Sequence, residues 1–359
     1  MRGLLPLLWC VLVVAAAGVQ TAAQRLTRQQ LERIEDTERR EGEAIVALAD
    51  AALNGDRTPA DFPIQWHNDF LKAQQGTFIP FVLTIDGPGL DAAALLVYLR
   101  AVARPAAESD ARGYPFEDVY PIDGRDGRRE PLRIVRGFSL APGDYDLYIV
   151  ARERVDPAHP ELRRKASVVK HALQVPDFSS DALTTSSVIL ADGLTALAEP
   201  PRPEALQERP YLIGLSEIQP ALDSRFRKNE ELIVVFLVYN PSVTLEKKFD
   251  IEVEYHFFRQ SAERGGGEAP GGAMAGRPLP RDGEAYFNHT RPQRLTPAIM
   301  GPGFDPAAGQ PVMAGQGVPL AAFPEGDYRL AITVTDRLSG RSITRDVRFT
   351  VVPAPGNGA

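Results

Sequence analysis

Histidines, carboxylates and nucleophiles are the residues that could do chemistry in this chain, but their spacing matches no known catalytic or metal-binding pattern. The chain has five histidines, and no two of them have the separation that zinc-binding pairs show. They are His67, His159, His171, His256 and His289. His256 lies on the polar face of a strand-like stretch, which predicts a solvated side chain and not a ligand. We therefore expect no metal site.

Two other stretches resemble functional loops only in outline. Asp123–Gly127 contains two carboxylates, but Arg125 stands between them, and the alternating acidic ligands of a calcium loop are missing. A tight turn is the expected structure there. The chain has no Gly-x-Ser-x-Gly elbow and no glycine loop that would hold a phosphate. These patterns predict no catalytic residue, no cofactor and no enzyme activity.

The composition is that of a folded, mildly acidic protein. Of the 359 residues, 44% are hydrophobic and 24% are charged, which is enough apolar material for two or three domains with buried cores. The formal net charge of −7 disfavours a nucleic-acid partner, because phosphates are bound by basic patches. It also disfavours electrostatic docking to anionic membranes.

The first residues have the pattern of an export signal. A positive residue precedes the apolar run Leu4–Val19, and small residues follow it. We expect residues 1–23 to be a signal peptide, which leaves a mature chain that starts at Gln24 without a membrane span; an uncleaved anchor is the alternative. The single cysteine, Cys10, lies inside the run, so the mature chain would have no disulfide. The expected location is the bacterial periplasm or the extracellular space.

A ten-residue stretch that occurs twice indicates the fold. Leu140–Ile149 and Phe323–Ile332 share the pattern Gly-Asp-Tyr-x-Leu-x-Ile, and an acidic residue followed by arginine comes later in both copies. Tyr145 and Tyr328 each follow a turn and open an alternating strand. This is the position of the tyrosine corner of immunoglobulin-like sandwiches, whose hydroxyl bonds to upstream backbone. The sequence therefore predicts a mainly β chain of two tandem immunoglobulin-like β-sandwiches.

Residues 24–75, which precede the first sandwich, are expected to be helical. Arg25–Leu53 has an interrupted apolar stripe and is followed by Asn-Gly, a common end of a helix. Ile64–Gln74 carries apolar residues at helical spacing and predicts a second, short helix. These residues are Trp66, Phe70 and Leu71.

Residues 76–178 contain the strands of the first sandwich, because six apolar or alternating runs lie in this range. The runs are Thr77–Ile85, Leu95–Val102, Phe116–Ile122, Leu132–Leu140, Tyr145–Arg152 and Ala166–Val175. Pro80 lies inside the first run, which predicts an edge strand or a bulge there. Residues 179–210 are expected to connect the two sandwiches: their proline-rich end predicts a stiff spacer, and a short strand at Val188–Leu190 is the alternative for the part before it.

Residues 211–353 are expected to form the second sandwich. Leu232–Tyr239 is continuously apolar, as a central strand buried on both faces would be. Phe249–Phe257 alternates apolar with polar residues and predicts a half-buried strand. The stretch 261–283 is rich in Gly, Ala and Pro and predicts a flexible insertion, and residues 354–359 form a tail.

Two segments of the second sandwich resemble a known group of proteins. Tyr211–Pro220 and Phe323–Ser342 are similar to the C-terminal β-sandwich part of exported bacterial proteins that often carry a GWxTD domain or a von Willebrand A-like domain upstream. Neither Gly-Trp-x-Thr-Asp nor the adhesion motif Asp-x-Ser-x-Ser occurs in this chain. The resemblance covers residues 211–353 and implies an accessory sandwich, with no site residue.

The repeated strand of the first sandwich predicts one candidate contact surface. If its tyrosine points inward, Tyr148 and Val150 point outward, where the second copy has the less apolar Ala331 and Thr333. We expect the N-terminal helical segment to cover this pair, with a partner site as the alternative, because bare apolar patches are rare on monomers. The residues expected to cover it are Trp66, Phe70 and Leu48.

The function that these patterns favour is binding. We expect an exported, non-enzymatic protein that contacts an unidentified protein partner of the cell envelope. Carbohydrate binding through exposed aromatic side chains is the alternative, and an enzyme is the third interpretation. A row of exposed aromatics would favour sugar, two close carboxylates in a cleft would favour an enzyme, and an apolar patch would favour a protein partner.

Overall fold

A computed structural model describes residues 28–86, 90, 94–104, 114–122, 131–154, 163–199, 208–261, 278–300 and 304–354. The expected signal peptide, the Asp123–Gly127 turn, and most of the 261–283 insertion and the 354–359 tail lie outside these ranges. Within them, no helix is long and apolar enough to cross a membrane. The chain divides into two compact units, residues 1–44 and 45–359.

The α-helix of the described chain is α1 (Arg28–Leu53), and the boundary between the two units falls within it. In the first unit, Arg39 pairs with Asp36 at 3.1 Å and with Glu43 at 2.8 Å, as neighbours one turn apart on a helix do. In the second unit, Ile45 is fully buried, so this part of the helix is held by packing. The expectation of a helix ending at Leu53 is confirmed.

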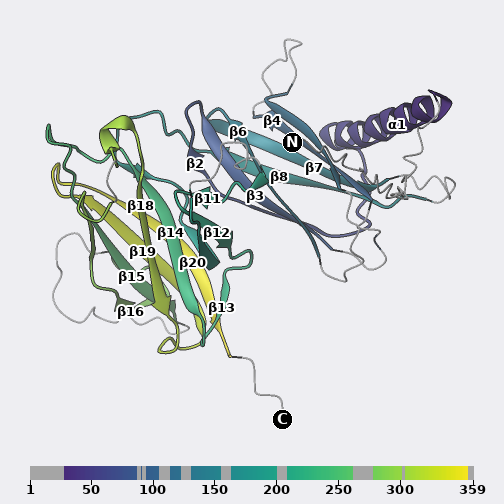
Figure 1. Cartoon of the computed structure of the whole chain (residues 1–359). Coiled ribbons are helices and arrows are strands. Elements are labelled where there is room, and N and C mark those ends of the chain that lie inside the picture. Colours follow the sequence, from purple (N-terminus) through teal and green to yellow (C-terminus); the bar gives the residue numbers. More distant parts are fainter. Residues whose placement is uncertain are drawn as a thin grey trace, which may run out of the picture. The chain divides into compact units, whose positions relative to one another are not determined.

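The first sandwich consists of two antiparallel sheets (Figure 1). Sheet A has the order β5-β4-β7-β8; in sheet B, β3 pairs with β1 and β2 and also with β6. The strands of sheet A are β4 (Leu95–Ala103), β5 (Phe116–Ile122), β7 (Gly143–Glu153) and β8 (Ala166–Val175). Those of sheet B are β1 (Ile64–Asn68), β2 (Leu71–Lys72), β3 (Thr77–Ile85) and β6 (Leu132–Leu140). All six strands expected from residues 76–178 are present.

The short helix expected at Ile64–Gln74 is wrong, because this stretch forms β1 and β2. Trp66 pairs with Leu83 across β1 and β3, and its ring stacks on Phe81 with 4.4 Å between centroids. The segment is too short for a helix to be stable without a packed face, whereas pairing with β3 satisfies its backbone. The helical segment therefore ends at Leu53, and the first sandwich begins at Ile64.

Pro80 lies in a central strand and at no edge, which corrects the expectation for this residue. It stands opposite Gly137 of β6, and on its other side the partner strand is interrupted between β1 and β2. The Asp69 amide in that interruption donates to the Pro80 carbonyl at 3.0 Å. A proline, which has no amide hydrogen to donate, is tolerated where the neighbouring ladder has a break.

The second sandwich also has two sheets. Sheet C has the order β11-β12-β10-β14-β18, with β9 on β14, and sheet D the order β13-β20-β19-β15-β16, with β17 on β15. Sheet C consists of β9 (Thr184–Thr185), β10 (Ile189–Ala196), β11 (Leu212–Ile213), β12 (Ser216–Pro220), β14 (Glu231–Tyr239) and β18 (Val312–Pro319). Sheet D consists of β13 (Arg225–Arg227), β15 (Ile251–Gln260), β16 (Glu284–His289), β17 (Gln293–Leu295), β19 (Gly326–Asp336) and β20 (Arg341–Val352). A 3-10 helix, η1 (Pro306–Ala308), precedes β18.

The connector expected at residues 179–210 is wrong over much of its length, because β9 and β10 belong to sheet C. Ile189 of β10 pairs with Val235 of β14 and is buried. Apolar side chains that enter a sheet bring their segment into the domain core, so the second sandwich begins at Thr184 and not at Tyr211.

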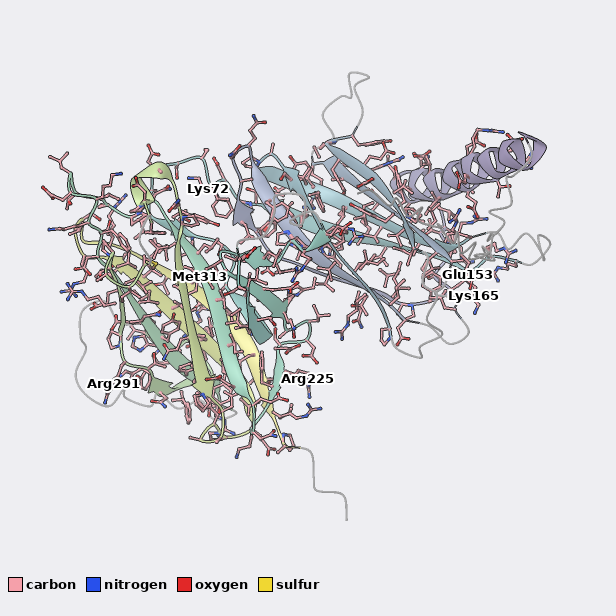
Figure 2. The ribbon with its side chains drawn as sticks, viewed as in Figure 1. Lys72, Glu153, Lys165, Arg225, Arg291 and Met313 are labelled. Atoms are coloured by element: carbon pink, nitrogen blue, oxygen red, sulfur yellow. The ribbon has the colours of Figure 1, made fainter. Side chains whose placement is uncertain are left out.

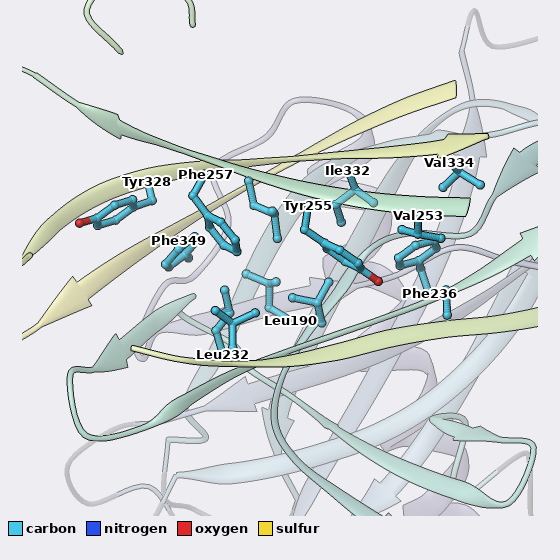
Figure 3. Packing of buried hydrophobic residues seen from close by; sticks show 14 of the residues in the cluster. Leu190, Leu232, Phe236, Val253, Tyr255, Phe257, Tyr328, Ile332, Val334 and Phe349 are labelled. Carbon is cyan, nitrogen blue, oxygen red and sulfur yellow. The ribbon is translucent and has the colours of Figure 1, made fainter. Parts of the chain in front are cut away.

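The core between sheets C and D combines aliphatic side chains with a group of aromatic rings (Figure 3). Phe257 meets Phe349 edge to face, with 6.2 Å between centroids, and Tyr328 stacks on Phe349 at 5.2 Å. β14 is buried on both faces, as its sequence predicted: Phe236 points into this core, and Leu237 packs into a third cluster that includes residues of the first sandwich. The two sandwiches therefore share apolar contacts.

The repeat also preserves an ion pair, but with the charges exchanged. In the first sandwich, Asp146 of β7 lies 2.9 Å from Lys170 of β8. The matching residues of β19 and β20 are Arg329 and Asp346, which lie 2.9 Å apart. Arg329 is buried and is bound by Glu284 as well, at 2.6 Å.

Candidate binding surface

The repeated tyrosines have a structural position. The Tyr145 hydroxyl donates to the Ala141 carbonyl at 3.0 Å, and that of Tyr328 donates to the Pro324 carbonyl at 2.6 Å. Both bonds run four residues back across the turn, which is the geometry of a tyrosine corner. Burial raises the pKa of both phenols. These residues hold the turn before the strand and offer no chemistry.

The repeated acid–arginine pair fixes the far end of the same strand. The Arg154 amide donates to the Ala94 carbonyl at 2.8 Å, and the Arg337 amide donates to the Asp250 carbonyl at 2.9 Å. In the first copy, the acid also binds the segment before β8: the Lys165 amide donates to the Glu153 carboxylate at 2.8 Å, and both residues are labelled in Figure 2. The repeat therefore marks both ends of one strand in each sandwich.

The candidate contact surface of the first sandwich is buried, which agrees with the expected cover by the N-terminal helical segment and disagrees with the alternative of a partner site. Tyr148 and Val150 are buried, and Val150 lies in a cluster with Ile45 and Ala49 of α1. Lys170 lies over the Tyr148 ring, 5.6 Å from its centroid. The residues named as a cover divide between two places: Leu48 packs on this cluster, whereas Trp66 and Phe70 pack against the interior core.

A buried arginine that the sequence did not point to joins α1 to sheet A. Arg100 of β4 donates to the Tyr98 hydroxyl at 2.6 Å, to Asp50 of α1 at 2.5 Å and to Glu117 of β5 at 3.2 Å. Its guanidinium also lies 4.0 Å from the centroid of Tyr114. A lone charged residue in the apolar run of β4 was the only signal. Since every described contact is internal, we interpret this cluster as a clamp and not as a site.

His256 is buried, so the expectation of a solvated side chain is wrong. Its ring stacks on that of His289 at 5.9 Å, and the Tyr286 hydroxyl lies 2.8 Å from His289 Nδ1. The outward face of sheet D is covered here, since Phe258 and Ala331 on the same face are buried too. Strict alternation predicts which face a residue takes but not what covers that face.

The cavity that is richest in carboxylates has no catalytic arrangement. It has a volume of about 510 Å³ and is lined by Asp192, Asp223, Glu230 and Glu231 together with two arginines. Arg227 pairs with Glu230 at 3.1 Å, and Asp223 accepts the Arg225 amide at 3.0 Å, so two of these four acids have local partners. In the described ranges, no three His, Cys, Asp or Glu side chains are grouped to hold a metal ion.

One end of the second sandwich carries apolar side chains in solvent. Ile251 is in register with both Leu295 and Asp336, so the segments that adjoin these residues leave sheet D at the same end. Three of the most exposed large apolar residues lie on these segments: Leu245 (101% exposed), Ile299 (63%) and Leu338 (46%). We call Leu245, Ile299 and Leu338 the apical surface.

A tight turn holds Leu245 outward. The Lys247 amide donates to the Thr244 carbonyl at 2.9 Å, and the Thr244 amide donates to the Lys248 carbonyl at 2.9 Å. Lys247 has a φ of +58°, a left-handed conformation that costs a non-glycine residue about 1 kcal/mol. Such strain persists only where the surrounding bonds determine the backbone, and it is common at functional positions.

The Asp336 carboxylate ties the turn of Leu338 to the loop of Leu245. It is fully buried and accepts the Ser242 amide at 2.8 Å, the Leu338 amide at 3.0 Å and the Ser339 hydroxyl at 2.7 Å. Burial alone would raise the pKa of Asp336, but the bonds from Ser242 and Ser339 outweigh it and lower the pKa to about 2. The carboxylate therefore stays ionised and keeps both loops in place.

The charges around the apical surface are paired with one another. Arg294 donates two hydrogen bonds to the Asp250 carboxylate, at 2.8 and 2.6 Å. Arg337 lies 3.0 Å from both carboxylate oxygens of Glu252. Lys247 pairs with Asp305, which joins a third loop to the turn. The rim is therefore polar but nearly neutral. Sequence reasoning missed this surface, because exposure at a loop depends on which segments meet there.

Comparisons with known proteins do not assign the chain to a family. No family model matches the chain, and no curated protein does. Among solved structures, a mutant of Salmonella alpha-2-macroglobulin is similar, with 13% sequence identity and a TM-score of 0.21. The match covers 83% of this chain and 15% of that chain, so this chain spans a small part of that protein. A TM-score this low carries no argument about fold or function.

Proposed function

We propose that this is an exported, non-enzymatic binding protein that contacts a protein partner through the apical surface of its second sandwich. The observation that carries the proposal is the rigid presentation of Leu245 in solvent at the tip of a bonded turn. An apolar side chain held this way gains about 1.5–3 kcal/mol when a partner buries it fully. Little ordering entropy is lost, because the turn is already fixed. Export rests on the apolar run Leu4–Val19.

The shape and charge of the apical surface describe its partner. Leu245 protrudes, so the partner must offer an apolar hollow to receive it. The surrounding arginines and acids pair internally, which leaves little net charge for long-range attraction. Binding should therefore depend on apolar burial and vary little with ionic strength.

A protein partner is favoured over a carbohydrate by the type of exposed residue. Sugar rings are held by aromatic faces, and the apical surface has Leu and Ile instead. Among the described aromatic side chains, Tyr114 alone is more than about a third exposed, at 37%, and it lies over Arg100. No described cluster places a nucleophile beside a base and an orienting group, so an enzyme stays the third reading.

The test is capture of envelope proteins on the immobilised mature chain, with matched variants. Leu245→Ser with Leu338→Ser removes two apical side chains whose exposure makes folding insensitive to the change. Leu279→Ser is the control, because Leu279 is 71% exposed and lies elsewhere. The expected result is a protein retained by the wild type and the control, lost by the apical variant, and held equally at low and high salt.

Two results would overturn the proposal. Retention of every captured protein by the apical variant would show that the surface is not used. Specific binding of the wild type to an oligosaccharide, unaffected by the apical changes, would favour the carbohydrate function instead.

A further inference from the structure

This chain itself has a cavity that could receive the protruding Leu245 of a partner. A cavity of about 440 Å³ is lined by apolar residues from both sandwiches, within the range of volumes that receive ligands. Its apolar walls are Val82 and Val135 of the first sandwich and Ile218, Pro220 and Leu222 of the second. We propose that the partner is a second copy of this chain, whose Leu245 enters this cavity. This inference rests on the proposed function.

The charges at the two places are compatible with this contact. Leu245 is followed by Glu246 and Lys248, one charge of each sign. The cavity is lined by Arg133, Asp192 and Glu208, while Arg209 and Glu217 pair with each other at 2.9 Å. A turn that enters the cavity can therefore bring Glu246 toward Arg133 and Lys248 toward Asp192. Opposite charges that meet at the rim fix orientation more than they add affinity.

The geometry determines the kind of assembly. The turn and the cavity share no residue, so the contact joins two different patches. Unless a two-fold axis closes a pair through two such contacts, the contact is heterologous. A heterologous contact leaves a free turn at one end of the pair and a free cavity at the other, so copies add head to tail. Each copy carries a net charge of −7, and the mutual repulsion is screened by salt. This repulsion is already screened at physiological ionic strength, so self-association rests on apolar burial and should vary little with further salt.

The experiment is sedimentation velocity of the full mature chain across the micromolar to millimolar range. The wild type should form oligomers that grow with concentration. Leu245→Ser should weaken association about tenfold or more, the loss expected for one buried leucine, and Leu279→Ser should change nothing. On the cavity side, Val135→Phe fills the wall, and Gln219→Trp blocks the space from an exposed position, so the second variant keeps the test valid if the first does not fold.

Mixing supplies the decisive result. Leu245→Ser keeps a free cavity and Gln219→Trp keeps a free turn, so each should be monomeric alone, and the two together should form a dimer that grows no further. A wild type that stays monomeric throughout overturns the self-assembly. If the apical variant then still loses a captured envelope protein, the proposed function stands without it; if it loses nothing, both are wrong.

Discussion

Asp336→Asn should loosen the apical loops in a way that depends on pH. The carboxylate accepts bonds from two sides, from Ser242 of one loop and from Leu338 and Ser339 of the other. An amide has one accepting oxygen, and its NH2 group would face an amide or hydroxyl that also donates. The variant therefore loses the charge and turns a buried NH2 group toward a backbone amide, which can only donate.

The magnitude follows from the pKa. The pKa of Asp336 is about 2 in the folded chain, against an ordinary value of 3.8. At 1.36 kcal/mol per pKa unit, ionisation of this group stabilises the fold by about 2–3 kcal/mol at neutral pH. The folded pKa is the lower one, so this stability is complete above the unfolded pKa and is lost as the pH falls toward 2. About half of it should remain at pH 3.

Denaturant unfolding at pH 7, 5 and 3 measures this contribution, and hydrogen exchange of the Ser242, Leu338 and Ser339 amides locates it. Asp336→Asn should cost about 2–3 kcal/mol at pH 7 and about 1 kcal/mol less at pH 3. The control is Asp282→Asn, since Asp282 is exposed. The same cost at every pH, or a cost no larger than that of the control, would refute the reasoning.

Four further substitutions test the frame that carries this surface. Tyr145→Phe and Tyr328→Phe each leave a turn carbonyl unpaired and should cost about 1–3 kcal/mol in denaturant unfolding; no shift in either would mean that the corner bonds do not stabilise the fold. Glu284→Gln should cost about 3 kcal/mol, because it removes a partner of the buried Arg329 charge, and a thermal melt equal to the wild type would contradict this. Val150→Asp should destabilise the chain by several kcal/mol, because the new charge must be desolvated beneath α1, and a folded variant seen by circular dichroism would show that α1 does not cover this face.

The sequence predicted the strands well where side chains alternate or run apolar. β3, β5, β6 and β8 have the bounds that their apolar runs indicated, because burial on one or both sheet faces is a local pattern. The prediction was wrong at Ile64–Gln74, where a stretch with apolar residues at helical spacing forms two short strands. Pairing with β3, a long-range contact, decides the structure there, and no window of that length contains it.

The candidate site was less accessible to sequence reasoning than the fold. Tyr148 and Val150 were correctly placed on the outward face of β7, but α1 and Lys170 take up that face. Leu245 is one leucine in an ordinary loop, and nothing in its neighbours marks it. Its exposure follows from the turn at Lys247 and from the bonds to Asp336, which come from segments about ninety residues apart in the chain.

The exchanged ion pair of the two sandwiches has a consequence for folding. Two repeats with nearly the same strand pattern can exchange hairpins while the chain is still open, which is a common failure of repeat proteins. If β8 paired with β19, Lys170 would stand beside Arg329; if β20 paired with β7, Asp346 would stand beside Asp146. Either mistake brings like charges together, and at Arg329 it does so in a buried place. The charge on each strand therefore favours pairing within its own sandwich and disfavours pairing between the two repeats.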